Sequence, residues 1–210
     1  MSDILEALQW RYATKKFDAG RYLTTEKIAV VKNAFNLTAS SFGLQPVKLL
    51  VIQDQKLQDD LVSISMDQQQ VADASHVLVF CIEKNIDKEY IKAYFDNVKK
   101  TRNTPDEILQ PFREYLFGHF KKESPEAIEN WATKQAYLAM GNLLTICAIE
   151  KIDACPMEGF NSESYDELLG LSEKGLSSVL VMPIGYRAED DMFADFKKVR
   201  KTLSDAVIEF

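Results

Sequence analysis

The sequence predicts an α+β protein in which helices wrap a mixed central sheet. Apolar, strand-like runs at 47–52, 76–82 and 177–184 alternate with helical patterns. Several helical patterns follow one another between the second and third runs, which is unlike a regular βαβ series. The chain has 210 residues, 46% of them hydrophobic and 27% charged, which is typical of a packed globule. We expect one domain over 1–210.

Apolar periodicity and capping residues predict the helices. Thr24 is a good N-cap for a helix over 25–37. The apolar stretch from Ala136 to Ile149, interrupted by Asn142, is too short to span a bilayer and predicts a buried helix that also contributes to a subunit interface. The remaining helical patterns cover 3–11, 55–65, 87–121 and the rest of 125–150.

Two of the predicted strands have features that bear on the fold. The run at 76–82 (HVLVFCI) is continuously apolar, which predicts a strand buried on both faces. Residues 206–210 (AVIEF) predict a short terminal strand with no room for a return connection. Such a strand can join its own sheet or that of a second subunit.

Charge and cysteine content exclude several classes of partner. Acidic side chains exceed basic ones by 32 − 25 = 7, which disfavours general binding to nucleic acid or to an anionic membrane. Three cysteines without a C-x-x-C pair, and no export signal in residues 1–18, favour a reducing cytoplasm.

Common catalytic motifs are missing from the sequence. There is no G-x-G-x-x-G and no G-x-S-x-G, and Leu176 stands where a P-loop would need lysine. His76 and His119 lack a set of companion ligands, so we expect no metal site. If the protein is an enzyme, a bound cofactor must supply the chemistry.

Four segments are nevertheless candidates for parts of one binding site. They are Arg11–Phe17, Ser40–Pro46, Pro156–Phe160 and the basic run Lys197–Lys201. Each has a plain interpretation by itself: a solvated charge cluster, a helix cap or a turn. Basic residues from the first and last of them, brought together, would form a pocket for a phosphate.

Six stretches in the same order resemble the FMN-dependent nitroreductase family, especially the oxygen-insensitive NAD(P)H nitroreductase and dihydropteridine reductase group. The stretches are RYATKKFD at 11–18, SS…QP at 40–46, DASHVLVF at 73–80, WATKQAYLAMGN at 131–142, PMEGF at 156–160 and KVR at 198–200. The resemblance implies a nitroreductase-like fold and an intertwined homodimer with C-terminal strand exchange. It also implies FMN at the subunit interface.

The resemblance also assigns residues to the FMN site. It implies that Arg11, Lys198 and Arg200 hold the phosphate and that Lys15 lies near the pyrimidine edge of the flavin. A cation there would stabilise the charge that collects at N1 and O2 on reduction. The other cofactor-binding residues it implies are Tyr12, Ala13, Ser40, Ser41, Asp67, Gln70, Pro156, Glu158 and Gly159, with both serines coming from the partner chain and Glu158 and Gly159 offering backbone N–H groups to N5 and O4.

The substrate side of the site is implied in the same way. Phe117 matches the aromatic residue that covers the flavin face, where it flanks N5 together with Glu158. Arg102 is aligned with a residue that helps to hold the nicotinamide cofactor. Phe42 and Leu44 replace polar residues of some members and would make the acceptor pocket more apolar.

Two departures from the family pattern concern the flavin itself. Asp67 stands where members often have asparagine, and Gln70 stands where many have a second lysine. Each change removes positive charge from the pyrimidine edge or adds negative charge to it. Both are expected to make the flavin harder to reduce.

The resulting expectation is an NAD(P)H oxidoreductase that reduces nitroaromatics, quinones or similar small acceptors through flavin N5 with ping-pong kinetics. Its expected partners are a second copy of the chain and the acceptor. Asp67 and Gln70 leave an alternative open, a non-catalytic flavin-binding redox sensor or storage protein. A structural dimer without cofactor is the third possibility.

Overall fold

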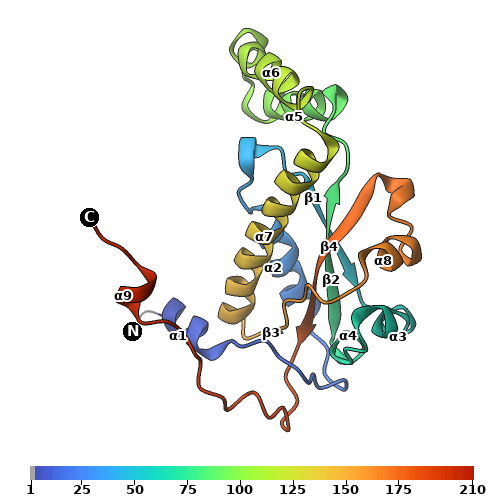
Figure 1. Ribbon diagram of the computed structural model, residues 1–210, viewed down its shortest axis with the longest axis vertical. Coiled ribbons are helices and arrows are strands. Elements are labelled where there is room, and N and C mark those ends of the chain that lie inside the picture. The colour runs from blue at the N-terminus through green and yellow to red at the C-terminus, as the bar shows by residue number, and fades with distance from the viewer. Residues whose placement is uncertain (1–2) are drawn as a thin grey trace.

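A computed structural model describes residues 3–210 (Figure 1). The helices are α1 (Asp3–Trp10), α2 (Thr25–Asn36), α3 (Gln55–Val62), α4 (Gln70–Asp73), α5 (Lys88–Arg102), α6 (Asp106–Phe120), α7 (Pro125–Ile149), α8 (Ser162–Leu168) and α9 (Leu203–Ala206). Most predicted helices are confirmed within a few residues. The Thr24 hydroxyl accepts a hydrogen bond from the Lys27 amide and begins α2 as expected.

The sheet has four strands in the order β1-β2-β4-β3. The strands are β1 (Val47–Ile52), β2 (His76–Glu83), β3 (Asp153–Ala154) and β4 (Leu176–Gly185). All three pairings between them are antiparallel, so the expectation of a mixed sheet is wrong for these strands. A buried apolar run reveals that a strand is covered on both faces, but it carries no information about strand direction. The one parallel pairing found among the described residues is an isolated bridge between Ala13 and Ala154.

Alternate residues of β2 enter two separate cores, which confirms that this strand is buried on both faces. Leu78 and Phe80 face the core beneath α2 and α7, and Val77 and Val79 face the core beneath α3 and α8. The side chain of Tyr165, on α8, is fully buried in the second core. The sheet is therefore the middle layer of a helix–sheet–helix arrangement (Figure 1).

The helical pair α5–α6 stands beyond one end of the sheet, and α1 and α9 lie out to one side, at the lower left of the view (Figure 1). The pair has its own small apolar core, which includes Ile91, Phe95 and Leu116. Between them, α7 runs along the sheet and leaves Tyr137, Leu138 and Ile149 exposed. No helix in the described part of the chain is long and apolar enough to cross a membrane.

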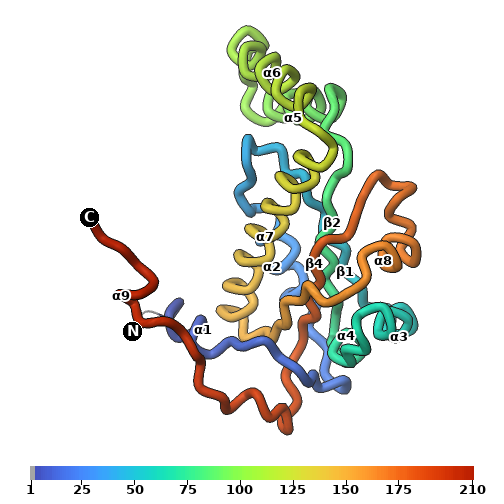
Figure 2. The backbone as a smooth tube through the Cα atoms, in the orientation of Figure 1, coloured from blue at the N-terminus to red at the C-terminus, as the bar shows by residue number. Residues whose placement is uncertain are grey.

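After β4 the chain leaves the sheet and ends in an outstretched segment (Figure 2). The prediction of a strand over 206–210 is wrong for the single chain, because Leu203–Ala206 forms a short helix and the residues after it pair with no strand. Extended backbone becomes a strand only beside another strand. The exposed side chains of Val207, Ile208 and Phe210 follow α9. Exchange of this segment between subunits stays a prediction.

Candidate functional site

Residues 11–17 follow α1 as an irregular segment against the edge of the sheet. The bridge from Ala13 to Ala154 and a second bridge from Phe17 to Arg187 fix its two ends. The Thr14 amide donates to the Ala154 carbonyl at 3.3 Å. This segment therefore runs beside β3 and beside the chain that leaves β4, so residues from both ends of the sequence meet here.

A buried carboxylate, that of Asp191, holds the same segment from the other side. Its Oδ2 accepts hydrogen bonds from the Tyr12 hydroxyl at 2.8 Å, the Lys15 amide at 3.0 Å and the Lys16 amide at 3.2 Å. Its Oδ1 accepts from the Phe193 amide at 3.1 Å. Burial opposes ionisation of Asp191, but these hydrogen bonds together hold its pKa below the ordinary value.

The three predicted phosphate ligands, Arg11, Lys198 and Arg200, gather beside this segment. The Lys198 ammonium donates to the Arg11 carbonyl. The pKa of Arg11 is lowered by burial and by the neighbouring Arg200. The pKa of Lys198 is lowered by burial and by the positive charges of Arg11, Arg200 and Arg187. Among the described residues, none of Arg11, Lys198 and Arg200 forms an ion pair with a carboxylate. The result is a cluster of like charges that an anion would relieve.

The neighbouring Arg187 has a different role. Its Nε donates to Asp153 Oδ1 at 2.7 Å, and its backbone amide donates to Asp153 Oδ2 at 2.9 Å. The guanidinium carbon lies 4.4 Å from the ring centre of Trp10 and 4.6 Å from that of Tyr12. Arg187 is thus paired with Asp153 and stacked on two aromatic rings, and it supports the wall of the cation cluster.

Lys15 and Gln70 converge on one buried thiol. The Lys15 ammonium lies 3.8 Å from Cys155 Sγ, and Gln70 Nε2 lies 3.9 Å from the same sulfur. Gln70 Nε2 also donates to Gln68 Oε1 at 2.9 Å. Burial raises the pKa of Cys155, so the thiol is neutral and the Lys15 charge is not cancelled there. Both side chains are hydrogen-bond donors suited to the polar edge of a ring.

The segment Pro156–Gly159 is fixed between β4 and the turn before α4. Met157 and Val181 exchange two backbone hydrogen bonds, of 2.8 and 3.1 Å. The Gly159 carbonyl accepts from Gln68 Nε2 at 2.8 Å. A Cβ on Gly159 would lie 3.2 Å from both Gln68 Nε2 and Met66 Sδ, so a side chain there would crowd this turn. Glu158 is exposed, and its Oε1 accepts from the Tyr137 hydroxyl at 2.7 Å.

Asp67 lies on the same turn but makes no side-chain contact of note among the described residues. Met66 and Asp67 both adopt positive φ angles, 55° and 54°, and both are exposed. Two consecutive left-handed residues reverse the chain sharply between α3 and α4. The turn thereby carries Gln68 and Gln70 inward while Asp67 faces solvent.

Ser40 and Ser41 lie elsewhere in the single chain. The loop that contains them is near the α5–α6 end of α7, and the segment after α1 is near its other end (Figure 1). The Ser41 amide donates to Gln135 Oε1 at 2.8 Å, and Ser40 Oγ accepts from the Gln45 amide at 2.9 Å. The single chain therefore does not bring these serines to Arg11, and their contribution from a partner chain stays a prediction.

The three predicted substrate residues are also far from the cation cluster in the fold. Phe42 packs against the aromatic rings of α6, including His119 and Phe120. Phe117 lies on α6, and Arg102 is the exposed last residue of α5. Phe117 belongs to α6, which stands beyond the end of the sheet (Figure 1), whereas Glu158 follows Met157, which is hydrogen-bonded to Val181 of β4.

Sequence reasoning missed several residues that shape the site, chiefly Asp191, Asp153, Arg187 and Gln68. Asp191 sits in an ordinary-looking acidic stretch, AEDD, and its partners on the segment after α1 are at least 175 positions away. Local spacing carries no signal for such contacts. Within the described residues, no group of three or more His, Cys, Asp or Glu side chains is arranged to hold a metal ion.

Together, the fold and this site define an α+β protein with a cluster of cations beside a segment that carries Lys15. Residues 8–186 match the Nitroreductase family. The chain belongs to this family, which confirms the resemblance and the nitroreductase-like α+β fold inferred from it.

Comparison with individual proteins agrees with this assignment. The chain is 32% identical to a proposed NAD(P)H nitroreductase of Staphylococcus saprophyticus over 97% of this chain and 95% of the relative. It is 30% identical to the oxygen-insensitive NAD(P)H nitroreductase of Enterobacter cloacae over 99% of each. A proposed nitroreductase of Exiguobacterium sibiricum, solved in complex with FMN, superposes with a TM-score of 0.84 at 19% identity, over 100% of this chain and 98% of that one. The predicted class, an NAD(P)H-dependent oxidoreductase, is confirmed by the family.

Proposed function

We propose that two copies of this chain bind FMN between them and transfer electrons from NADH or NADPH to nitroaromatics, quinones or similar small acceptors. The cation cluster carries this proposal. Arg11, Lys198 and Arg200 crowd together without a carboxylate partner among the described residues, beside a segment that presents Lys15. A phosphate at one end and a polar ring edge at the other match the shape of FMN.

The donor chemistry of the site fits this cofactor. The burial and mutual repulsion that lower the pKa values of Arg11 and Lys198 would be offset by a dianionic phosphate. Lys15 and Gln70 present N–H groups on either side of the neutral Cys155 thiol. Such donors suit the carbonyl oxygens and ring nitrogens of a flavin. The absence of a Cβ on Gly159 would let its backbone approach a ring closely.

When bound, FMN would accept a hydride at N5 and later deliver it to an acceptor. The chain's own residues bind and orient. Arg11, Lys198 and Arg200 anchor the phosphate, with Tyr12 and Ala13 on the segment that carries Arg11. Asp191 fixes that segment, and Lys15 places its positive charge at the ring edge.

The remaining assigned residues complete the proposal. Pro156, Glu158 and Gly159 lie along one edge of the ring, and Asp67 and Gln70 lie at the pyrimidine end. Ser40, Ser41, Phe42, Arg102 and Phe117 reach the site from the partner subunit. Exposed apolar side chains on α1 and α7, and on the outstretched C-terminal segment, supply surface for such a dimer. The site then needs both chains, and we expect the protein in the cytoplasm.

Anaerobic titration of the purified, yellow protein tests the proposal. NADH or NADPH should bleach the flavin absorbance near its visible maximum, and a nitro compound or quinone should restore it. Steady-state rates at several acceptor concentrations should give parallel double-reciprocal lines, because one site serves donor and acceptor in turn. A flavin that neither donor bleaches would instead indicate the redox sensor or storage protein.

A further inference from the structure

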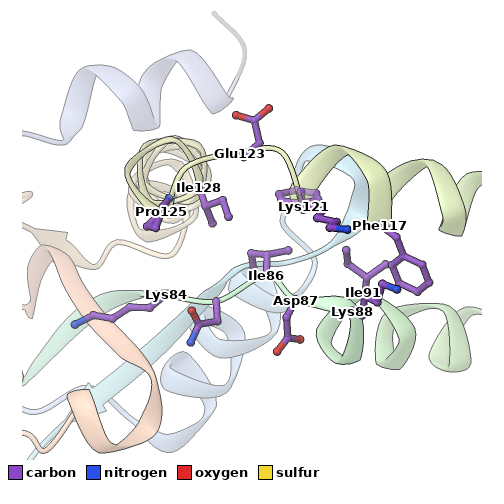
Figure 3. Close-up of a pocket in the computed structure, with 12 residues that line it drawn as sticks. Lys84, Ile86, Asp87, Lys88, Ile91, Phe117, Lys121, Glu123, Pro125 and Ile128 are labelled. Atoms are coloured by element: carbon purple, nitrogen blue, oxygen red, sulfur yellow. The ribbon is translucent and has the colours of Figure 1, made fainter.

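We propose that the chain has a second small-molecule site, away from the cofactor segment, which binds a compact apolar molecule carrying one carboxylate or sulfonate. The site is the pocket between the turn after β2, the end of α6 and the start of α7 (Figure 3). We call it the distal pocket. Its volume is about 470 Å³, within the range that holds drug-sized ligands.

The floor of the distal pocket is apolar and preformed. Ile86, Ile91 and Phe120 line it and are at least 95% buried. Pro125 and Ile128 close the side formed by α7. Residues that are buried in the free chain lose little conformational entropy when a ligand arrives, so this floor is suited to an apolar body.

Positive charge lies on one side of the pocket. The Lys88 ammonium lies 5.6 Å from the ring centre of Phe117, and Figure 3 shows that the ammonium groups of Lys88 and Lys121 both point toward this ring. The two lysines come from different helical segments, at the start of α5 and just after α6. An anion beside Phe117 could therefore contact both.

The two acidic residues of the pocket are engaged elsewhere. Asp87 Oδ1 accepts from the Tyr90 amide at 2.8 Å, which caps α5. Glu123 Oε1 lies 3.9 Å from His119 Nδ1. In Figure 3 both carboxylates point out of the pocket, on opposite sides. The side that faces a ligand therefore presents ammonium groups over an apolar floor.

This combination selects a class of ligand. A neutral apolar molecule would leave the two ammonium groups without a partner, and a simple inorganic anion would leave the floor uncovered. A flat aromatic acid meets both requirements, since its ring can pack on Phe120 and Ile128 while its anionic group lies between Lys88 and Lys121.

Titration calorimetry with 2-naphthoate tests the proposal on the FMN-loaded protein at low ionic strength, where exposed charges are least screened. Neutral 2-naphthalenemethanol serves as the uncharged probe. The test variant is Lys88→Gln with Lys121→Gln. The matched control is Lys92→Gln with Lys122→Gln, which removes two exposed charges from the same helical segments but outside the pocket. A filling variant, Ile128→Trp, checks the position independently.

We expect 2-naphthoate to bind the wild type. The two substitutions of the test variant should weaken its binding affinity at least about fivefold, because they remove charge-assisted contacts. The control variant should change the affinity for 2-naphthoate less than fivefold. Ile128→Trp should weaken that affinity at least as much as the test variant does. The neutral probe should bind the wild type at least fivefold more weakly than 2-naphthoate. The proposal is overturned if the wild type does not bind, if the test variant loses less than fivefold, or if control and test variants lose affinity equally. Equal binding of the two probes would also overturn it.

Discussion

The Tyr12 hydroxyl donates a 2.8 Å hydrogen bond to Asp191 Oδ2, and this contact joins residues 179 positions apart. The same oxygen accepts from the backbone of Lys15 and Lys16. One buried carboxylate thus determines where the segment after α1 lies relative to the chain after β4. Both segments contribute cations to the candidate site. Loss of this contact would therefore displace those cations and weaken cofactor binding.

Removal of that carboxylate should loosen the site and the fold together. Asp191→Ala leaves four donors, the Tyr12 hydroxyl and three backbone amides, without their acceptor. We expect the free energy of unfolding to fall by about 2–3 kcal/mol, as is typical when buried donors lose their partner. Urea denaturation measures this loss. Asp190→Ala is the matched control, because Asp190 is exposed and pairs with the exposed Lys16, and it should leave the unfolding midpoint unchanged. Equal effects of the two variants would contradict the role given to Asp191.

The same carboxylate should make stability depend on pH in one direction. The folded state holds the pKa of Asp191 below its ordinary 3.8, so its stabilisation is fully present above about pH 4 and is lost as the pH falls further. We therefore expect the difference in unfolding free energy between wild type and Asp191→Asn to be constant from pH 7 to near 5. It should shrink toward pH 3. A difference that grows on acidification would show that Asp191 is not held as an anion.

Gln70→Lys should make the bound flavin easier to reduce. A lysine here would add a second positive charge beside Lys15 at the proposed pyrimidine edge. We expect the two-electron reduction potential to rise by roughly 30 mV or more, equivalent to about 1.4 kcal/mol. Potentiometric titration with a redox dye measures it. Gln69→Lys adds the same charge one position away, on an exposed side chain, and should shift the potential much less. Equal shifts would mean that Gln70 does not face the ring.

Arg200→Ala should release FMN without unfolding the protein. Arg200 is exposed, and its side-chain contact within the chain is to the neighbouring Val199 carbonyl, so its loss costs the fold little. Loss of a charge-assisted contact to phosphate is expected to weaken FMN binding by about 10- to 100-fold. Flavin fluorescence during titration of the apoprotein gives the affinity, and thermal unfolding checks the fold. Lys201→Ala, which removes the next exposed charge, should bind FMN nearly as well as wild type. Full flavin content in Arg200→Ala after desalting would contradict the phosphate assignment.

Local signals in the sequence predicted local structure well. The cap at Thr24 and the bounds of the strand at 47–52 were predictable because they depend on neighbouring residues alone. The antiparallel direction of β2 and β4 was not, since both strands are apolar on both faces whichever way they run. The basic run at 197–201 was visible in the sequence, but its approach to Arg11 depends on contacts such as that of Lys198, made 187 positions away.

The outstretched C-terminal segment shows a second limit. Its apolar residues predict a strand over 206–210, yet an extended segment needs a neighbouring strand, and the single chain provides none beside it. Likewise, the serine loop and α6, which carries Phe117, lie at the opposite end of α7 from the segment after α1 (Figure 1). Both observations concern residues whose predicted partners belong to another copy of the chain, which one sequence cannot place.

Native mass spectrometry of the purified protein, combined with its visible absorbance, tests the central claim most directly. We predict a yellow particle of two chains with two FMN molecules, which loses both flavins and its NAD(P)H-driven activity together when the cofactor is stripped. A colourless single chain that still reduces quinones or nitro compounds with NAD(P)H would contradict the account.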